Sequence, residues 1–130
     1  YLPDVQMRLV LYKRISNAKT TDALRALQVE MIDRFGLLPE PVKNLFRVTE
    51  IKLIAADLGI SRIDLGPRGG KIDFLQNTKV PAERVIELVQ KQSHSYKFAS
   101  ANRIAIVDTI DDREKRFKLI ENLLERFLAT

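Results

Sequence analysis

Few residues in this sequence could carry out chemistry. Its 130 residues include no cysteine and a single histidine, His94, which lies in a polar run between Gln92 and Tyr96. A transition-metal site would therefore need ligands that are almost all carboxylates. The acidic pair Asp111 and Asp112 is explained by the predicted start of a helix, where the helix dipole favours negative charge. We predict no catalytic and no metal-binding residue in this chain, and we interpret His94 as a surface side chain.

A glycine-rich segment, Gly69-Gly70-Lys71-Ile72, has a composition similar to that of a phosphate-binding loop. It lacks the G-x-x-x-x-G-K-[ST] spacing, and Ile72 stands where such a loop has the hydroxyl that contacts Mg²⁺. We interpret the segment as the turn of a β-hairpin. We therefore expect this chain to bind no cofactor and to hydrolyse no ATP.

One predicted helix presents two carboxylates, Glu30 and Asp33, on the side away from its apolar residues. The apolar stripe of this helix has helical spacing and consists of Leu24, Leu27, Met31 and Phe35. At roughly 100° per residue, Glu30 and Asp33 lie about 60° apart. From the residues alone, this acidic pair is either a solvated helix surface or part of a binding surface.

Basic residues form two short clusters. Lys13 and Arg14 lie near the end of the first predicted helix, and Arg113, Lys115 and Arg116 lie near the start of the last one. These residues are the best candidates for contacts with phosphate groups, and the alternative is a solvated basic surface. The net charge is +5, with acidic and basic residues interspersed along the whole chain. This composition permits nucleic-acid binding without requiring it.

The elements that must position these residues begin with three helices. Apolar periodicity places them at about residues 4–18, 21–35 and 41–58. Asp4 can cap the first helix, and Thr20 or Thr21 begins the second. Gly36 and Gly59 follow the second and third helices, at the position where glycine commonly ends a helix.

The remaining chain alternates between strands and helices. The predicted elements are a hairpin with strands near residues 63–65 and 72–74, a helix over 81–92, a second hairpin with strands at 97–99 and 103–107, and a last helix that begins at Asp111. Asp111 and Glu114 have the spacing of a capping box.

We expect Phe35 and Ile86 to face inward. The order predicts an α+β fold, in which helices pack on a small antiparallel sheet. We expect one domain over 1–130, with a possible subdivision into 1–58 and 59–130.

The composition is typical of a soluble globular protein, with 45% apolar and 30% charged residues. No apolar run approaches the roughly 20 residues that span a membrane, and no signal peptide is expected. The absence of cysteine fits a reducing compartment, so we predict a cytoplasmic protein. Because the sequence begins with Tyr1 rather than methionine, we expect it to be a piece of a longer protein.

Three segments resemble the C-terminal domain of bacterial transcription-repair coupling factor, the Mfd family. These segments are Tyr1–Asp4 together with Arg8–Ile15, Val29–Pro39, and Leu58–Ile60 before a glycine-turned hairpin. The first two motifs are long and specific, whereas the part from Lys79 onward is more generic. The resemblance covers nearly the whole chain.

The resemblance implies that the parent protein is a large cytoplasmic DNA translocase, helicase-like and driven by ATP with Mg²⁺. Such factors displace stalled RNA polymerase from damaged duplex DNA and recruit the excision-repair protein UvrA. Their ATPase, polymerase-binding and UvrA-binding modules lie upstream of the C-terminal domain. The resemblance therefore assigns no ATP hydrolysis to this chain.

Within that family the C-terminal domain is autoinhibitory, because it packs against the N-terminal UvrA-binding module and restrains the translocase. The resemblance implies that Glu30 and Asp33 contact arginines of that module. A carboxylate accepts two parallel hydrogen bonds from a guanidinium group, and exposed ion pairs are weak enough for such a contact to open. We therefore predict a regulatory clamp. The alternative is an accessory DNA-binding domain, with phosphate contacts at Lys13, Arg14, Arg113, Lys115 and Arg116.

Overall fold

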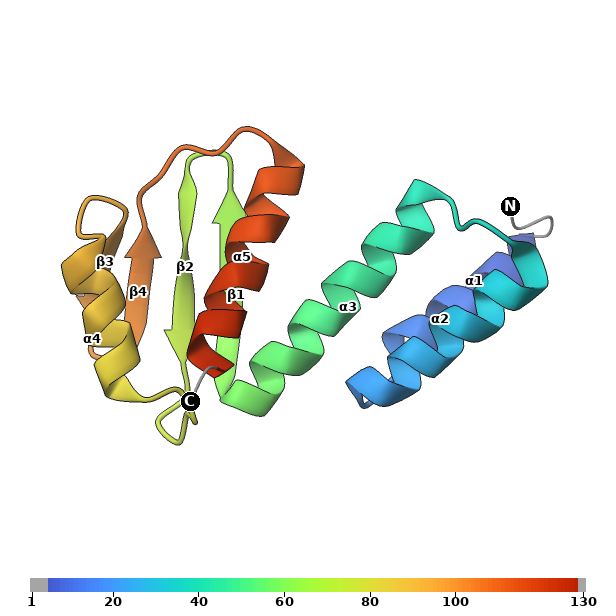
Figure 1. The fold of residues 1–130 in the computed structure, drawn as a ribbon, viewed down its shortest axis with the longest axis horizontal. Coiled ribbons are helices and arrows are strands. Elements are labelled where there is room, and N and C mark those ends of the chain that lie inside the picture. Colours follow the sequence, from blue (N-terminus) through green and yellow to red (C-terminus); the bar gives the residue numbers. More distant parts are fainter. Residues whose placement is uncertain (1–4, 129–130) are drawn as a thin grey trace. The chain divides into compact units, whose positions relative to one another are not determined.

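The computed structural model describes residues 5–128, which form five helices and a four-stranded antiparallel sheet (Figure 1). The order of helices and hairpins is the predicted one, and the α+β class is confirmed. The chain divides into two compact units, and the boundary between Ile54 and Ala55 falls inside α3 (Glu40–Leu58). Among residues 5–128, no helix combines the length and the apolar character that a membrane crossing requires.

The first unit consists of α1 (Val5–Ser16), α2 (Thr21–Phe35) and most of α3. The Thr20 hydroxyl accepts a hydrogen bond from the Ala23 N–H at 3.0 Å, which caps the first turn of α2. Gly36 ends this helix with φ at 77°, and its N–H donates to the Ile32 carbonyl at 2.8 Å. The predicted cap of the first helix, Asp4, lies outside the described residues.

The core of the first unit comes from one apolar stripe on each of its helices and from Leu38 in the loop between α2 and α3. Its buried side chains are Leu11, Ile15, Leu24, Leu27, Met31, Leu38, Val42 and Phe46. The expectation for Phe35 is met only in part, because its ring packs against this core but is half-buried. The Arg34 guanidinium lies 5.4 Å from the centroid of the Phe35 ring, so this end of the stripe remains accessible to solvent.

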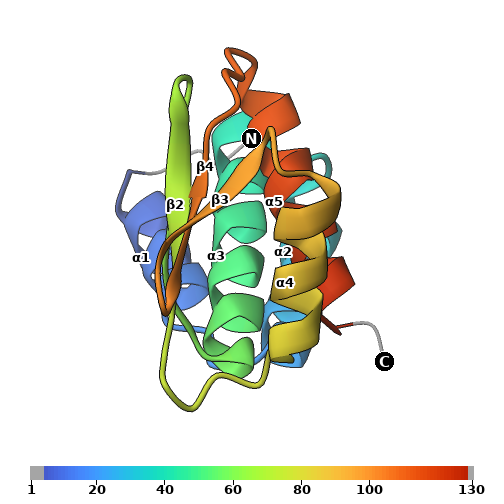
Figure 2. The same ribbon diagram turned by 90° about the vertical axis from the view of Figure 1, so that its left-hand side faces the viewer.

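The second unit is built on a sheet with the strand order β1-β2-β4-β3. Its strands are β1 (Ile60–Gly66), β2 (Gly69–Phe74), β3 (Tyr96–Ser100) and β4 (Arg103–Ile106). The helices α4 (Ala82–Lys91) and α5 (Arg113–Leu128) lie on one face of this sheet, as the two perpendicular views show (Figures 1 and 2).

Side chains alternate across the sheet as the pleat requires. Ile72 and Phe74 of β2 and Ile104 and Ile106 of β4 are buried on the helical face. Phe127 of α5 meets Phe74 edge to face, with ring centroids 5.9 Å apart. This face is completed by the buried side chains of Leu88, Leu123 and Leu124. The opposite face carries mostly charged residues.

The β1–β2 turn explains the glycine-rich segment. Gly69 has φ at 112°, and a Cβ there would collide with the Ile106 carbonyl oxygen. A Cβ on Gly70 would collide with the Asp64 carbonyl oxygen on the neighbouring strand. Both glycines are thus required by close backbone packing, and Lys71 lies within β2 opposite Asp64. The hairpin interpretation is confirmed.

Two local predictions were wrong in the second unit. The last helix begins at Arg113, and its cap is Asp112, whose Oδ1 accepts from the Glu114 N–H at 2.8 Å. Asp111 is kept in the preceding loop because the Arg116 guanidinium donates to its carbonyl oxygen at 2.9 Å. Ile86 was expected to face inward, but it is 44% exposed, whereas Leu88 on the same helix is buried.

Candidate interaction surface on the second helix

Glu30 and Asp33 differ in their surroundings, although both lie away from the buried stripe of α2. Glu30 is turned toward α1, where Arg14 donates two hydrogen bonds to its carboxylate oxygens, at 2.7 and 3.3 Å. The side chains remain 42% and 47% exposed, respectively, so water reaches this ion pair. The predicted acidic pair therefore includes one carboxylate that already has an arginine partner.

The environment of Glu30 favours its charged form. The hydrogen bond from Arg14 lowers the pKa of this carboxyl group, and the positive charges of Arg14 and Arg34 act in the same direction. The same contact raises the pKa of Arg14. A bidentate arginine–carboxylate pair fixes geometry as well as charge. It thus links α1 to α2 at the edge of the exposed face.

Asp33 lies on the exposed face of α2, and the described residues provide no ion-pair partner for it. Val29 is one turn earlier on the same side and is 59% exposed, and the neighbouring Ile32 is 45% exposed. We refer to Val29, Ile32 and Asp33 as the α2 surface. Large apolar side chains exposed around a charged group are typical of a surface that contacts another protein.

Sequence reasoning missed the apolar part of the α2 surface. Val29 and Ile32 lie outside the stripe that forms the core, and this displacement was a signal in the sequence. Leu37, which directly follows the C-cap glycine, is 88% exposed and adds a further apolar group near this end of the helix. The predicted pair of carboxylates thus has exposed apolar neighbours, and one of its members, Glu30, also has an arginine partner.

The predicted phosphate contacts are divided between the two units. Lys13 and Arg14 belong to α1, and Arg14 is occupied by Glu30. In the second unit, Arg113 lies over the ring of Phe117 at 5.5 Å, and Arg116 donates to the carbonyl oxygens of Ile110 and Asp111. Lys115 is exposed and lines a pocket beside α5.

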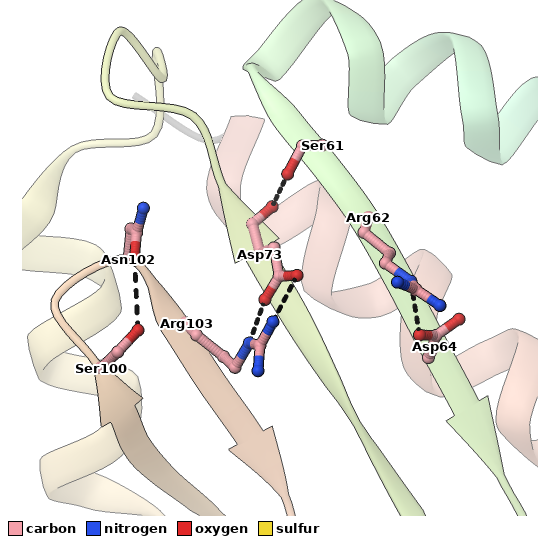
Figure 3. Close-up of polar contacts among 7 residues, drawn as sticks. All are labelled: Ser61, Arg62, Asp64, Asp73, Ser100, Asn102 and Arg103. Atoms are coloured by element: carbon pink, nitrogen blue, oxygen red, sulfur yellow. Dashed lines mark hydrogen bonds and ion pairs between the residues drawn. The ribbon is translucent and has the colours of Figure 1, made fainter.

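The charged face of the sheet holds a second bidentate pair, between Asp73 on β2 and Arg103 on β4 (Figure 3). The Arg103 guanidinium donates to the two Asp73 oxygens at 2.5 and 3.1 Å. This bond lowers the pKa of Asp73, and the charges of Arg103, Lys71 and Arg62 lower it further. Because the two residues are directly opposite in the register, the pair has a structural role across the strands. No group of three or more potential metal ligands occurs among the described residues.

A model of the TRCF domain family matches residues 1–85 of the chain. The transcription-repair-coupling factor of Haemophilus influenzae is 40% identical over 129 residues, which are 99% of this chain and 11% of that protein. The factor of Escherichia coli is 35% identical over 124 residues, which are 95% of this chain and 11% of that protein. The chain thus spans about a tenth of the length of these relatives.

A solved structure, described as the C-terminal domain of transcription-repair coupling factor, has the same fold. Its TM-score is 0.74 with 19% sequence identity, and the match covers 98% of this chain and 86% of that chain. The family model covers 85 of the 130 residues and includes the whole α2 surface. The chain therefore belongs to the TRCF domain family, whose relatives are transcription-repair-coupling factors.

Proposed function

We propose that this chain is the regulatory C-terminal domain of a transcription-repair coupling factor and that it holds the factor in an inhibited state. In this proposal the α2 surface contacts the UvrA-binding module of the same protein and covers the surface that UvrA needs. The parent protein is a cytoplasmic, ATP-driven DNA translocase that acts on stalled RNA polymerase. The clamp restrains it until polymerase is engaged.

The observation that supports this function is the accessible carboxylate of Asp33 beside the exposed apolar side chains of Val29 and Ile32. An arginine from the module can bind this carboxylate with two parallel hydrogen bonds. Burial of Val29 and Ile32 then stabilises the contact, by about 25 cal/mol for each Å² of apolar surface removed from water. Asp33 needs no rearrangement within this chain before it binds.

Glu30 has a second role in the same contact. Its bond to Arg14 must either persist beside the module or be exchanged for an arginine of the module. Exchange replaces one charge-assisted bond by another, so it changes the free energy little. In such a contact Asp33 and its apolar neighbours provide most of the binding free energy, and Glu30 contributes little.

A binding titration tests the proposal. The 130-residue chain is titrated with the UvrA-binding module of its parent as a separate protein. We expect Asp33→Arg to weaken binding by at least about tenfold, and Glu30→Arg to weaken it less, because Arg14 already neutralises Glu30. The charge-matched control is Glu125→Arg, which reverses one exposed carboxylate outside α2. Equal affinity of the Asp33→Arg variant and the unmodified chain would overturn the proposed contact.

The concentration range in this titration must suit a tethered interaction. In the parent protein the two modules share one chain, which raises their effective concentration to about millimolar. Weak binding between the separate proteins is therefore sufficient for a clamp. The comparison between variants, rather than the absolute dissociation constant, decides the result.

A further inference from the structure

A basic groove lies between α5 and the end of α4 in the second unit. Its volume is about 400 Å³, and the charged part of its lining comes from Lys115, Lys118 and Arg126 of α5. Its uncharged polar part comes from Gln92, Tyr96 and Asn122, and Leu119 and Leu123 provide the apolar remainder. We call these residues the α5 groove. It is separate in sequence from the α2 surface and plays no part in the proposed clamp.

The three cations share one side of α5. Their spacing, with Asn122 between Lys118 and Arg126, follows the three- and four-residue steps that place side chains on one helical face. At 1.5 Å per residue, the stripe from Lys115 to Arg126 is about 16 Å long. This length suits a ligand with several negative charges in a row better than a single anion.

No carboxylate occurs among the described residues that line the groove. Two acidic groups outside the lining act on residues near the groove. Glu87 on α4 is bonded to Lys91 at 2.9 Å, and that bond is the main reason for its lowered pKa, which the charges of Arg126 and Arg84 lower further. Asp108 is close enough to raise the pKa of Tyr96, an effect added to that of burial. The side chains that line the groove thus carry positive charge and no negative charge.

The groove also has a fixed floor. Tyr96 is buried and opens β3, and its N–H donates to the Gln92 carbonyl oxygen at 3.0 Å. Arg84 of α4 donates to the Arg126 carbonyl oxygen at 2.8 Å, which ties the end of α5 to α4. The amide groups of Gln92 and Asn122 can donate hydrogen bonds to a ligand oxygen. The cations thus project from a surface that is held in place by both helices.

We propose that the α5 groove binds the phosphate backbone of nucleic acid without sequence specificity, through Lys115, Lys118 and Arg126. Phosphate contacts of this kind position a strand and carry no base information. This set differs from the phosphate contacts predicted from the sequence. Arg113 and Arg116 are left out because they contact Phe117 and the loop before α5, and Lys118 and Arg126 are added because they line the groove. Only Lys115 is common to both sets.

The test uses fluorescence anisotropy of a labelled duplex DNA and, in parallel, a labelled single strand of the same sequence. If three phosphates are neutralised, a fourfold rise in salt should weaken binding by about 40-fold. We expect Lys115→Gln, Lys118→Gln and Arg126→Gln together to weaken binding by at least tenfold and to flatten the salt dependence. The matched control removes three exposed cations elsewhere in the second unit, by Arg68→Gln, Lys79→Gln and Lys97→Gln.

Amide chemical shifts locate the site without any substitution. Addition of DNA to the unmodified 130-residue chain should shift the signals of Gln92 and of residues 115–126 first. Tripolyphosphate should compete with DNA for these residues, since the two share phosphate chemistry. Loss of binding in the control variant to the same extent, or tripolyphosphate binding without DNA binding, would overturn the proposal. Shifts confined to residues outside the groove would overturn it as well.

Discussion

Arg14 and Glu30, sixteen residues apart in the sequence, form a bidentate ion pair that joins α1 to α2. The pair occupies one of the two carboxylates that the helical pattern placed on an exposed face and leaves Asp33 accessible. It also removes Arg14 from the set of cations that are free to bind phosphate. One contact between two helices therefore changes the interpretation of an acidic site and of a basic one.

This ion pair predicts a pH-dependent contribution to stability. Because the folded-state pKa of Glu30 is lowered, its contribution is present above the unfolded pKa, near 4.5, and is lost as the pH falls through the folded value. Urea unfolding of the unmodified chain and of Glu30→Gln should therefore differ at pH 7 and converge as the pH falls below the lowered folded-state pKa of Glu30. Glu125→Gln, an exposed carboxylate on α5, is the control and should differ little at either pH. A constant difference across this range would contradict the assigned role of Arg14.

The second prediction compares two residues of the α2 stripe. Met31 is fully buried, whereas Phe35 is only half-buried at the end of the helix. We expect Met31→Ala to lower the free energy of unfolding by about 2–5 kcal/mol, and Phe35→Ala by roughly half of the 3–5 kcal/mol that is usual for a buried ring. Thermal and urea melts of both variants provide the measurement. A Phe35→Ala variant clearly less stable than Met31→Ala would show that this ring is buried.

The third prediction uses two glycines with almost the same positive φ. Gly36 and Gly59 end α2 and α3 with φ at 77° and 80°. Alanine at either position is strained by the positive φ, at a cost of about 1–3 kcal/mol. A Cβ on Gly36 meets no atom within 4 Å, but on Gly59 it would come within 2.6 Å of the Thr78 Cα.

Gly59→Ala should therefore cost distinctly more than Gly36→Ala, because the backbone at Thr78 must move. That segment is fixed, since the Thr78 hydroxyl donates to the Leu58 carbonyl oxygen at 2.7 Å. The measurement is the free energy of unfolding of each variant from urea melts, with the unmodified chain as reference. Equal losses would mean that only the positive φ matters.

These positions show what could be predicted from the sequence. The stops at Gly36 and Gly59 and the cap at Thr20 depend on a few neighbouring residues, so local patterns were sufficient. The shift of the α5 cap from Asp111 to Asp112 depends on Arg116 holding the preceding loop, a contact that follows only from the folded chain. Likewise, the partner of Glu30 comes from another helix, and helical periodicity cannot identify it.

The last prediction concerns the parent protein. Asp33 lies on the surface without a partner among the described residues, so Asp33→Arg should leave the melting temperature of the 130-residue chain unchanged. In the proposed clamp the same change replaces an attraction by like-charge repulsion against an arginine of the UvrA-binding module. The clamp should open, and the parent should bind UvrA more tightly and show a higher basal ATPase rate.

Glu30→Arg should act in the same direction but also loses the bond to Arg14, so it should lower the melting temperature slightly. Val29→Ser with Ile32→Ser removes only the apolar neighbours and should open the clamp partly, without charge repulsion. The measurements are UvrA affinity and ATPase rate of the three parent variants, with Glu125→Arg as the control for a single charge reversal. UvrA affinity of the Asp33→Arg parent equal to that of the unmodified parent would mean that the α2 surface is a solvated helix face and not the contact that closes the clamp.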